Sequence, residues 1–449
     1  MSVVAEKNRV KQSYKYVGTR PARHDGLEKI NGKARFAADI TKPRMIHGHV
    51  LRSSHAHAKI LSIDTTEAEA MPGVKAVVTA SDFPLPKKDE GFPHRPKNLI
   101  ARDKVRYEGQ AVAAVAATTR RQAREAAAKI VVNYQELPTV MTIDEAMAED
   151  APLVQENLIM KGSDSKTAKP SNIAERDFYE RGDIDVGFAE ADFVYENEFT
   201  TEAFHQGYIE PHACLADTGK DGRSEIWCSS QGHFKVRSAT ANMLGWETSR
   251  IKVVPAEIGG GFGGKTTIYL EPLAVKLSEK ADRPVKMVMS RDEVFKATGP
   301  TPGTKIRVKI GAKKSGEITA GKAWLAYQSG AFPGPFAKLG GWCIFACYNI
   351  PNVQIESHSI LVNRPVNIAY RAPSAPMAAY STETVLDQIA KKIDMDPIDF
   401  RILNAVKEGD IQLGESVATT GNYPRIGLKE TLEAIKAVSY THLTLPTKA

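Results

Sequence analysis

The segment GGGFGGKT at residues 259–266 constrains the fold of this chain more than any other stretch, because five of its eight residues are glycine. It follows the strand-like run IKVVPAEI and precedes the helix-like run TIYLEPLAVKL. A strand, a glycine loop and a helix in this order present backbone N–H groups and a positive helix N-terminus to an anion. Glycines also let the backbone approach that anion closely. We therefore expect a phosphate or pyrophosphate site at this loop.

The same eight residues match two common nucleotide-binding patterns, but their surroundings fit neither well. Both the P-loop pattern G-x-x-x-x-G-K-[ST] and the dinucleotide pattern G-x-G-x-x-G can be read from Gly259 onward. A P-loop needs an acid at the end of an apolar strand, and Asp292 does not directly follow its strand. A dinucleotide site needs an acid at a strand end, whereas Glu279 and Asp282 end a predicted helix. A P-loop nucleotide hydrolase remains an alternative interpretation.

Composition and charge exclude several classes of protein. The chain has 60 Lys+Arg and 53 Asp+Glu, a net charge of +7 that is spread without a basic stripe, so we do not expect nucleic-acid binding. No apolar run approaches the roughly 18 residues that a membrane span needs, and no apolar leader marks export. Four Cys residues do not make a disulfide framework. We expect a cytoplasmic protein.

Hydrophobic patterning predicts two mixed regions, 17–145 and 183–437, joined by a polar linker at 146–182. In the first region, strands are predicted at 46–51, 74–79, 110–117 and 131–134, with a helix at 119–130. In the second, strands are predicted at 193–200, 225–229, 251–258, 285–289, 304–310 and 318–329, and helices at 234–244, 267–280, 382–393 and 397–406. Sheets with packed helices in this order predict an α+β fold.

The two ends of the chain differ in character from the rest. Residues 1–16 are expected to be a polar tail. A predicted amphipathic helix at 428–437 is followed by VSYTHLTLPTKA at 438–449, a string that resembles translated sequencing-adapter read-through. We therefore expect residues 438–449 to be non-native and the natural chain to continue past residue 437.

The run HQGYIEPHAC at residues 205–214 brings two histidines, a glutamate and a cysteine together and could suggest a metal site. On an alternating strand, His205 and Glu210 would face opposite sides, which does not support a shared zinc ion. We expect these side chains to pack or to line a substrate funnel.

Five segments carry a family resemblance, and they occur in the family's order. They are HGHVLRSSHAHAKI at 47–60, YEGQAVAAVAA at 107–117, SSQGHF at 229–234, IGGGFGGK at 258–265 and YRAP at 370–373. They resemble two hammerhead signatures, a glutamine-bearing strand end, the molybdopterin loop and an arginine loop of the xanthine dehydrogenase/aldehyde oxidase large subunit. This resemblance to the molybdenum hydroxylases implies an α/β hammerhead domain at 17–145. It further implies the first half of a molybdopterin-binding α+β domain at 183–437.

The resemblance also implies a site. Gln231 would be the catalytic residue, with its amide hydrogen-bonded to an oxygen on molybdenum, and the main-chain amide of Arg371 would approach the cofactor. Protein side chains would supply no metal ligand, because the pterin holds the molybdenum. The cofactor-binding residues would be Gln231, Gly260, Gly261, Phe262, Gly263 and Arg371.

Departures from the family pattern limit the substrate. Thr266 stands where purine-oxidising members have a glutamate, and Pro373 stands where they have an aromatic residue. The arginine expected near Leu339 is missing, and Ala372 replaces the copper-binding cysteine of carbon monoxide dehydrogenases. Thr266 and Pro373 are therefore candidate substrate-pocket residues. An aldehyde, an N-heterocycle or an aromatic thioester remains, hydroxylated at an electron-poor carbon with water as the oxygen source.

The resemblance finally implies partners. Electrons would pass to a small 2Fe-2S subunit and an FAD subunit in a dimer of heterotrimers, and the pterin would carry a cytosine dinucleotide.

No G-x-G-E-like segment supplies the family's catalytic glutamate, so we expect a fragment that is inactive alone. A non-catalytic binding module of the same fold is a second alternative.

Overall fold

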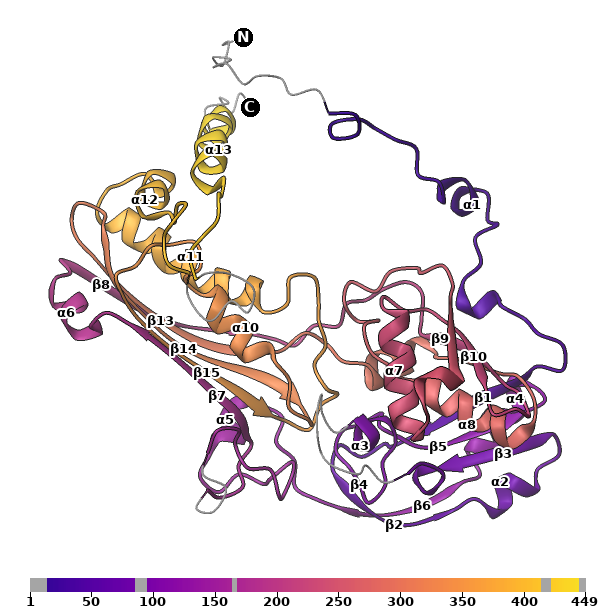
Figure 1. Ribbon diagram of the computed structural model, residues 1–449. Coiled ribbons are helices and arrows are strands. Elements are labelled where there is room, and N and C mark those ends of the chain that lie inside the picture. Colours follow the sequence, from indigo (N-terminus) through magenta and orange to yellow (C-terminus); the bar gives the residue numbers. More distant parts are fainter. Residues whose placement is uncertain (1–13, 85–94, 164–167, 413–420, 444–449) are drawn as a thin grey trace, which may run out of the picture.

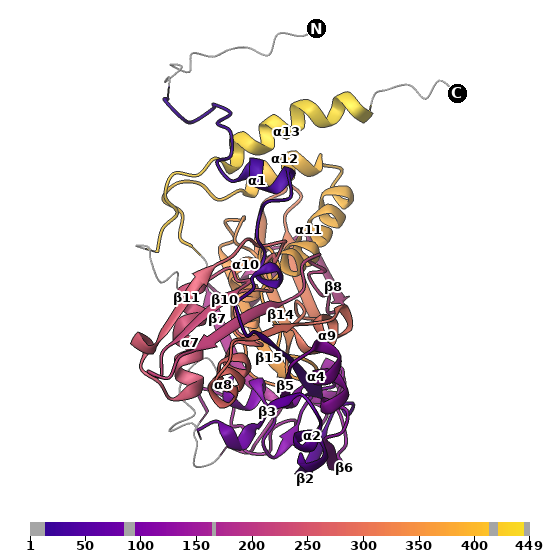
Figure 2. The same ribbon diagram turned by 90° about the vertical axis from the view of Figure 1, so that its right-hand side faces the viewer.

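The structure is a computed structural model that describes residues 14–84, 95–163, 168–412 and 421–443, and these residues fold into three β-sheets with packed helices. Figure 1 shows the seven-stranded and three-stranded sheets together and the five-stranded sheet beside them. In Figure 2 the three-stranded sheet and the helices α12 (Pro397–Asn404) and α13 (Leu428–Leu443) lie at opposite ends of the molecule. The α+β fold class predicted from the sequence is confirmed.

The seven-stranded sheet joins the two regions that the sequence separates. Strand β1 pairs in parallel with β12, with Ile46 opposite Val285, so strands of the first region continue a sheet of the second. One buried core beneath this sheet holds residues from both regions. In sheet order the strands are β11 (Ile251–Pro255), β10 (Ser224–Cys228), β9 (Ala213–Thr218), β12 (Val285–Val288), β1 (Ile46–Arg52), β5 (Ala111–Ala117) and β3 (Val74–Thr79).

Strand β5 shows why its residues form a central strand. Its sequence, AVAAVAA, is apolar without alternation, and every residue in it is buried. Ala114 and Ala116 belong to the core on the side of helix α8 (Glu271–Ala281), whereas Ala113 and Val115 pack with helix α4 (Arg120–Ala127). A strand covered by helices on both faces is expected to be continuously apolar.

The remaining small elements complete this part of the molecule. The three-stranded sheet consists of β4 (Lys104–Val105), β2 (Ala58–Asp64) and β6 (Val131–Glu136). The other helices before the second sheet are α1 (Gly26–Ile30), η1 (Ala37–Asp39), α2 (Thr66–Ala70), η2 (Ala80–Asp82), α3 (Arg95–Leu99) and α5 (Ile143–Met147). Later helices not named elsewhere are α6 (Ile184–Ala189), α7 (His233–Leu244), η3 (Thr248–Arg250) and α9 (Arg291–Ala297).

The five-stranded sheet corrects part of the predicted linker. Its order is β7 (Ile173–Arg181), β15 (Asn352–Leu361), β14 (Ile318–Gly330), β13 (Thr304–Ala312) and β8 (Phe193–Thr201). Strand β7 lies within residues 146–182, which the sequence predicts as a linker, and it pairs with β15 at the sheet edge. Helices α10 (Phe336–Cys343) and α11 (Ala375–Lys392) cover one face, and their side chains form a second core with β13, β14 and β15.

Several helix boundaries differ from the sequence prediction, and the largest difference is at helix α11, which begins at Ala375 and not at residue 382. Helix α8 begins at Glu271, four residues after the predicted start at 267, because Ile268–Leu270 remain irregular. Helix α13 extends to Leu443 and so continues past residue 437, the expected end of the native chain. Residues 1–13 of the predicted tail and residues 444–449 lie outside the described residues. Within the described part of the chain, no helix combines the length and the apolar character that crossing a membrane requires.

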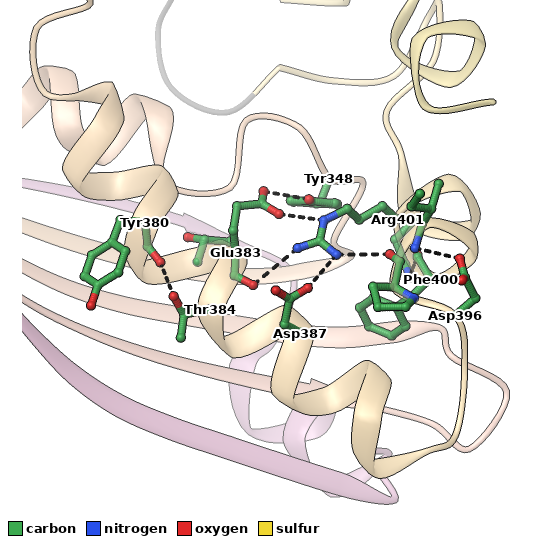
Figure 3. Close-up of polar contacts among 12 residues, drawn as sticks. Tyr348, Tyr380, Glu383, Thr384, Asp387, Asp396, Phe400 and Arg401 are labelled. Atoms are coloured by element: carbon green, nitrogen blue, oxygen red, sulfur yellow. Dashed lines mark hydrogen bonds and ion pairs between the residues drawn. The ribbon is translucent and has the colours of Figure 1, made fainter. Parts of the chain in front are cut away.

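A partly buried arginine joins helices α11 and α12 (Figure 3). The Arg401 side chain on α12 is 15% exposed and reaches two carboxylates on α11. Its Nε lies 2.7 Å from Glu383 Oε2, and its Nη1 lies 2.8 Å from Asp387 Oδ1. The Tyr348 hydroxyl donates to the other oxygen of Glu383. A planar guanidinium presents its N–H groups in a fixed arrangement, so it donates to both carboxylates at once.

We expect Arg401→Met to lower the free energy of unfolding by about 1–3 kcal/mol, because the carboxylates lose charge-assisted hydrogen bonds. Urea denaturation followed by circular dichroism measures this change. Arg121→Met is the control, since Arg121 is 81% exposed and pairs only along its own helix with Glu125. An equal shift of the midpoint in both variants would contradict the role assigned to Arg401.

Candidate functional site

Three loops meet at one edge of the seven-stranded sheet. Residues 202–212 precede β9, residues 229–232 follow β10, and residues 256–270 follow β11. The ends of these strands are adjacent, because Cys228 lies opposite Cys214 on one side and Pro255 on the other. The glycine loop is the third of these loops. Since helix α8 begins only at Glu271, the loop does not open directly onto a helix N-terminus, contrary to the sequence expectation.

Gln231 lies against the glycine loop. Its side-chain Oε1 accepts hydrogen bonds from the backbone N–H of Gly263 at 2.8 Å and of Lys265 at 3.2 Å. Its own backbone N–H donates to Lys265 O at 2.9 Å. A carboxamide oxygen that accepts twice leaves the amide nitrogen as the outward-facing donor. A Cβ at Gly261 would come within 2.6 Å of Gln231 Oε1, so any larger residue there would require the Gln231 carboxamide to move.

The tip of the glycine loop holds unpaired backbone donors. Among the described residues, none accepts a hydrogen bond from the N–H of Gly260, Gly261 or Phe262. The backbone here is also strained, since Phe262 has a φ of 52° without being glycine. Residues other than glycine rarely adopt such a backbone conformation. Where they do, the residue often lies at a ligand-binding site.

The Arg371 loop from the five-stranded sheet closes over the glycine loop. The Arg371 N–H donates to Phe262 O at 2.8 Å, so this amide, expected to face the cofactor, is already engaged. Ala372 and Ser374 both have positive φ, 60° and 68°, which makes this loop strained as well. A Cβ at Gly263 would lie 2.4 Å from Ala369 O, so only glycine permits the close approach of the two loops.

The structure gives Lys265 a role that a P-loop lysine does not have. Its side chain is 0% exposed, and its Nζ lies 2.6 Å from Glu210 Oε2. It is thus turned away from any ligand at the tip of the loop. The Thr266 hydroxyl, which would hold Mg²⁺ in a P-loop, donates to Gly263 O at 2.8 Å. The P-loop interpretation therefore has no support in the geometry.

A cavity of about 270 Å³ lies beside the Arg371 loop. Its wall is mainly apolar, and neither Thr266 nor Pro373, the predicted substrate-pocket residues, lines it. Thr266 instead folds back onto the glycine loop. The lining residues are Thr201, Glu202, Phe204, Thr301, Tyr370, Arg371, Pro376, Met377 and Tyr380.

The histidines of the 202–212 loop belong to a buried hydrogen-bonded chain. Residues 202–212 are irregular and do not form the alternating strand that was predicted for them. The Gly207 N–H donates to His205 Nδ1, so Nε2 carries the proton and donates to Thr298 Oγ1. The Tyr208 hydroxyl lies 2.7 Å from His212 Nε2 and 3.2 Å from Thr298 Oγ1. No cluster of three or more potential metal-binding side chains occurs in the part of the chain described.

Glu210 and Gln206 are site residues whose roles the sequence did not indicate. Gln206 is buried, and its Nε2 donates to Ala369 O at 2.9 Å, which ties the 202–212 loop to the Arg371 loop. Glu210 contacts the glycine loop through Gly259 and Lys265. These contacts join residues far apart in the sequence, so no local pattern could reveal them.

Two family models match this chain. The model described as "Molybdopterin cofactor-binding domain" matches residues 165–405, and "Aldehyde oxidase and xanthine dehydrogenase, a/b hammerhead domain" matches residues 31–138. The first match begins inside the predicted linker, in agreement with the presence of strand β7 there. The fold and the site thus define a molybdopterin-binding chain.

Known relatives agree with this class. The chain is 32% identical to the nicotinate dehydrogenase large molybdopterin subunit of Eubacterium barkeri, over 94% of this chain and 96% of that protein. It is 29% identical to the carbon monoxide dehydrogenase large chain of Afipia carboxidovorans, over 96% of this chain and 55% of that protein. Quinoline 2-oxidoreductase from Pseudomonas putida 86 superposes with a TM-score of 0.84 at 25% identity, over 95% of this chain and 54% of that one.

The chain therefore belongs to the xanthine dehydrogenase/aldehyde oxidase family of molybdenum hydroxylases, as its molybdopterin-binding large subunit. Its relatives are oxidoreductases. It spans nearly the whole of the Eubacterium barkeri subunit but about half the length of the other two relatives.

We expect Gly261→Ala to displace the Gln231 side chain, because the new methyl group would overlap Oε1. The overpacking should lower the free energy of unfolding by about 1–3 kcal/mol, which denaturant titration measures. Gly232→Ala is the matched control, since its Cβ would meet only Lys235 Cβ at 3.7 Å, an ordinary contact. An unmoved Gln231 in a crystal structure of Gly261→Ala would show that this packing is not tight.

Stability should fall on acidification because of His205. Burial, with a smaller effect of Arg291, lowers the pKa of His205 to about 4, against about 6.5 in the unfolded chain. Between pH 6.5 and 4 the unfolded state binds more protons, so the free energy of unfolding decreases as the pH falls. His205→Gln should reduce this slope in thermal melts, leaving the parts due to the other histidines whose pKa burial lowers, among them His212 and His57. The exposed control His24→Gln should keep the pH dependence of stability of the parent. If His205→Gln keeps it as well, this account of His205 fails.

Proposed function

We propose that this chain forms the part of a molybdenum hydroxylase that holds the pterin-bound molybdenum beside Gln231. The observation that carries the proposal is a set of hydrogen-bond donors that have no acceptor in the described part of the chain. Gln231 Oε1 is engaged by the glycine loop, and among the described residues none accepts from its Nε2, which can therefore donate to a ligand. The N–H groups of Gly260, Gly261 and Phe262 have no acceptor among the described residues.

These donors fit a group that is rich in oxygen atoms. Each free N–H can donate to an oxygen of the molybdenum centre or of the pterin phosphate. The Phe262 ring, 46% exposed, offers an apolar wall for the planar pterin. When bound, this group would supply the two-electron oxidation that hydroxylates an electron-poor carbon with oxygen from water. The residues of the chain would hold and orient it.

The substrate class that we favour is an aromatic N-heterocycle, ahead of an aldehyde or an aromatic thioester. The names of two relatives, nicotinate dehydrogenase and quinoline 2-oxidoreductase, both point to such rings. The apolar cavity beside Arg371 would accept a planar ring. Thr266 and Pro373 remain substrate-pocket candidates through their position in the two loops.

An exposed apolar rim around the site indicates that further polypeptide covers it. Isolated exposed apolar side chains are common, but a group of large ones around a ligand site marks an interface. These side chains are Phe204 (60% exposed), Ile209 (89%), Phe234 (86%), Phe262 (46%) and Tyr370 (37%). We assign this cover to polypeptide corresponding to the other half of the longer relatives, which would also bring the catalytic glutamate.

The domain boundaries and the assembly follow as parts of the same proposal. Residues 17–145 would be the hammerhead domain and 183–437 the first half of the cofactor-binding region, with β7 added at its start. Electrons would leave through a 2Fe-2S subunit and an FAD subunit in a cytoplasmic dimer of heterotrimers. The cytosine dinucleotide form of the pterin is the form that we expect.

We expect Gln231→Ala to reduce turnover by about 10²-fold in the complex purified with its partner subunits, because one oriented donor to the reacting centre is lost. Steady-state kinetics with a panel of N-heterocycles and aldehydes, together with the molybdenum content, measure the effect. Ser238→Ala is the control, since among the described residues that hydroxyl donates only within its own helix, to Lys235 O. A complex that contains no molybdenum or pterin would overturn the proposal.

A further inference from the structure

A buried ion pair lies directly behind the glycine loop. Lys265 is fully buried, and Glu210, whose side chain is 10% exposed, is its only charged partner within 4 Å in the described part of the chain. The Lys265 ammonium also lies 5.0 Å from the centre of the Tyr208 ring. Removing one member of such a pair leaves an uncompensated buried charge, which is strongly unfavourable. The two side chains therefore hold each other in place.

Glu210 connects the two ends of the glycine loop. Its Oε2 accepts from the Gly259 N–H at 2.7 Å and from Lys265 Nζ at 2.6 Å. The Glu210 N–H in turn donates to Gly259 O at 3.1 Å. A Cβ at Gly259 would lie 2.6 Å from Glu210 Cβ, so the backbone of the loop packs closely against the Glu210 side chain. One carboxylate oxygen thus fixes the positions of residues 259 and 265, on either side of the loop tip.

Lys265 also contacts Gln231 through its main chain. Its N–H donates to Gln231 Oε1, and its carbonyl accepts from the Gln231 N–H and from Ser230 Oγ. The orientation of the Gln231 carboxamide therefore depends on where residue 265 is held. The side chain of Lys265 points toward Glu210 on the inner side of the loop and away from the free donors at its tip.

We infer that Glu210 and Lys265 are positioning residues: their buried ion pair sets the orientation of the Gln231 amide and of the free N–H groups at the loop tip, without touching the cofactor. This inference rests on the proposed function of Gln231. It predicts that the pair acts on the site only through Gln231 and the loop, in the way that outer-shell partners orient the groups that contact a metal centre.

The test combines Lys265→Met and Glu210→Gln with Gln231→Ala in the complete complex with its partner subunits. Each single positioning variant should lower kcat about 10- to 100-fold with little change in KM. Hydrogen–deuterium exchange measured by mass spectrometry should become faster in residues 256–270 and in the loops 202–212 and 229–232 that contact them, while peptides outside these three loops stay unchanged. In the Gln231→Ala background, Lys265→Met should reduce kcat by much less than it does alone, because the shared effect is already lost.

Lys104→Met is the matched control, because Lys104 is also a buried lysine, 4% exposed, and pairs with Glu156 far from the glycine loop in the sequence. It should leave kcat and the exchange of residues 256–270 unchanged. Glu210→Gln keeps the size and an acceptor for the Gly259 N–H, so it provides the test if Lys265→Met does not fold.

The outcomes separate this inference from the proposed function. Suppose that Gln231→Ala lowers kcat and that the double variant lowers it by the product of the two single reductions. The two changes then act independently, the ion pair is merely structural, and the inference is wrong. Unchanged loop exchange in both positioning variants overturns it equally. If the parent complex contains no molybdenum or pterin, the proposed function itself fails, and the inference fails with it.

Discussion

The site depends on the close approach of two backbones, that of the glycine loop and that of the Arg371 loop. The Arg371 N–H donates to Phe262 O, and Gly263 lies so near Ala369 O that a side chain would not fit between them. One loop belongs to the seven-stranded sheet and the other to the five-stranded sheet. The contact therefore fixes the two sheets relative to each other at the place where the free donors gather. Fold and site are stabilised by the same interactions.

Patterns that are local in sequence predicted much of this structure. The strands around 46–51 and 74–79 are confirmed as β1 and β3, because apolar runs bounded by turn residues leave few alternatives. The glycine loop and Gln231 lie together, as the family resemblance implied. The sequence missed the strands β2, β7, β9 and β15. The charged and apolar residues of β7 (IAERDFYER) suit an edge strand with one solvated face but read as a linker.

Contacts between distant residues explain the other differences. The match to the P-loop pattern could not reveal that Lys265 is turned inward, because Glu210 lies 55 residues earlier in the chain. The Arg371 amide was expected to approach the cofactor, but it donates to Phe262 O, in the loop that follows a strand of the other sheet. Similarly, Ile46 pairs with Val285 across the boundary between the predicted regions. Each of these contacts depends on the tertiary fold, which residue spacing does not encode.

The left-handed backbone at Phe262, Ala372 and Ser374 has a consequence for engineering this protein. A non-glycine residue in that conformation is kept there by its surroundings, so changes in either loop will tend to relax the backbone before they alter selectivity. The wall of the adjacent cavity has no such constraint at Phe204, Met377 and Tyr380, none of which has a positive φ. A mutant library that aims at new substrates is therefore better built on those three positions than on the loops.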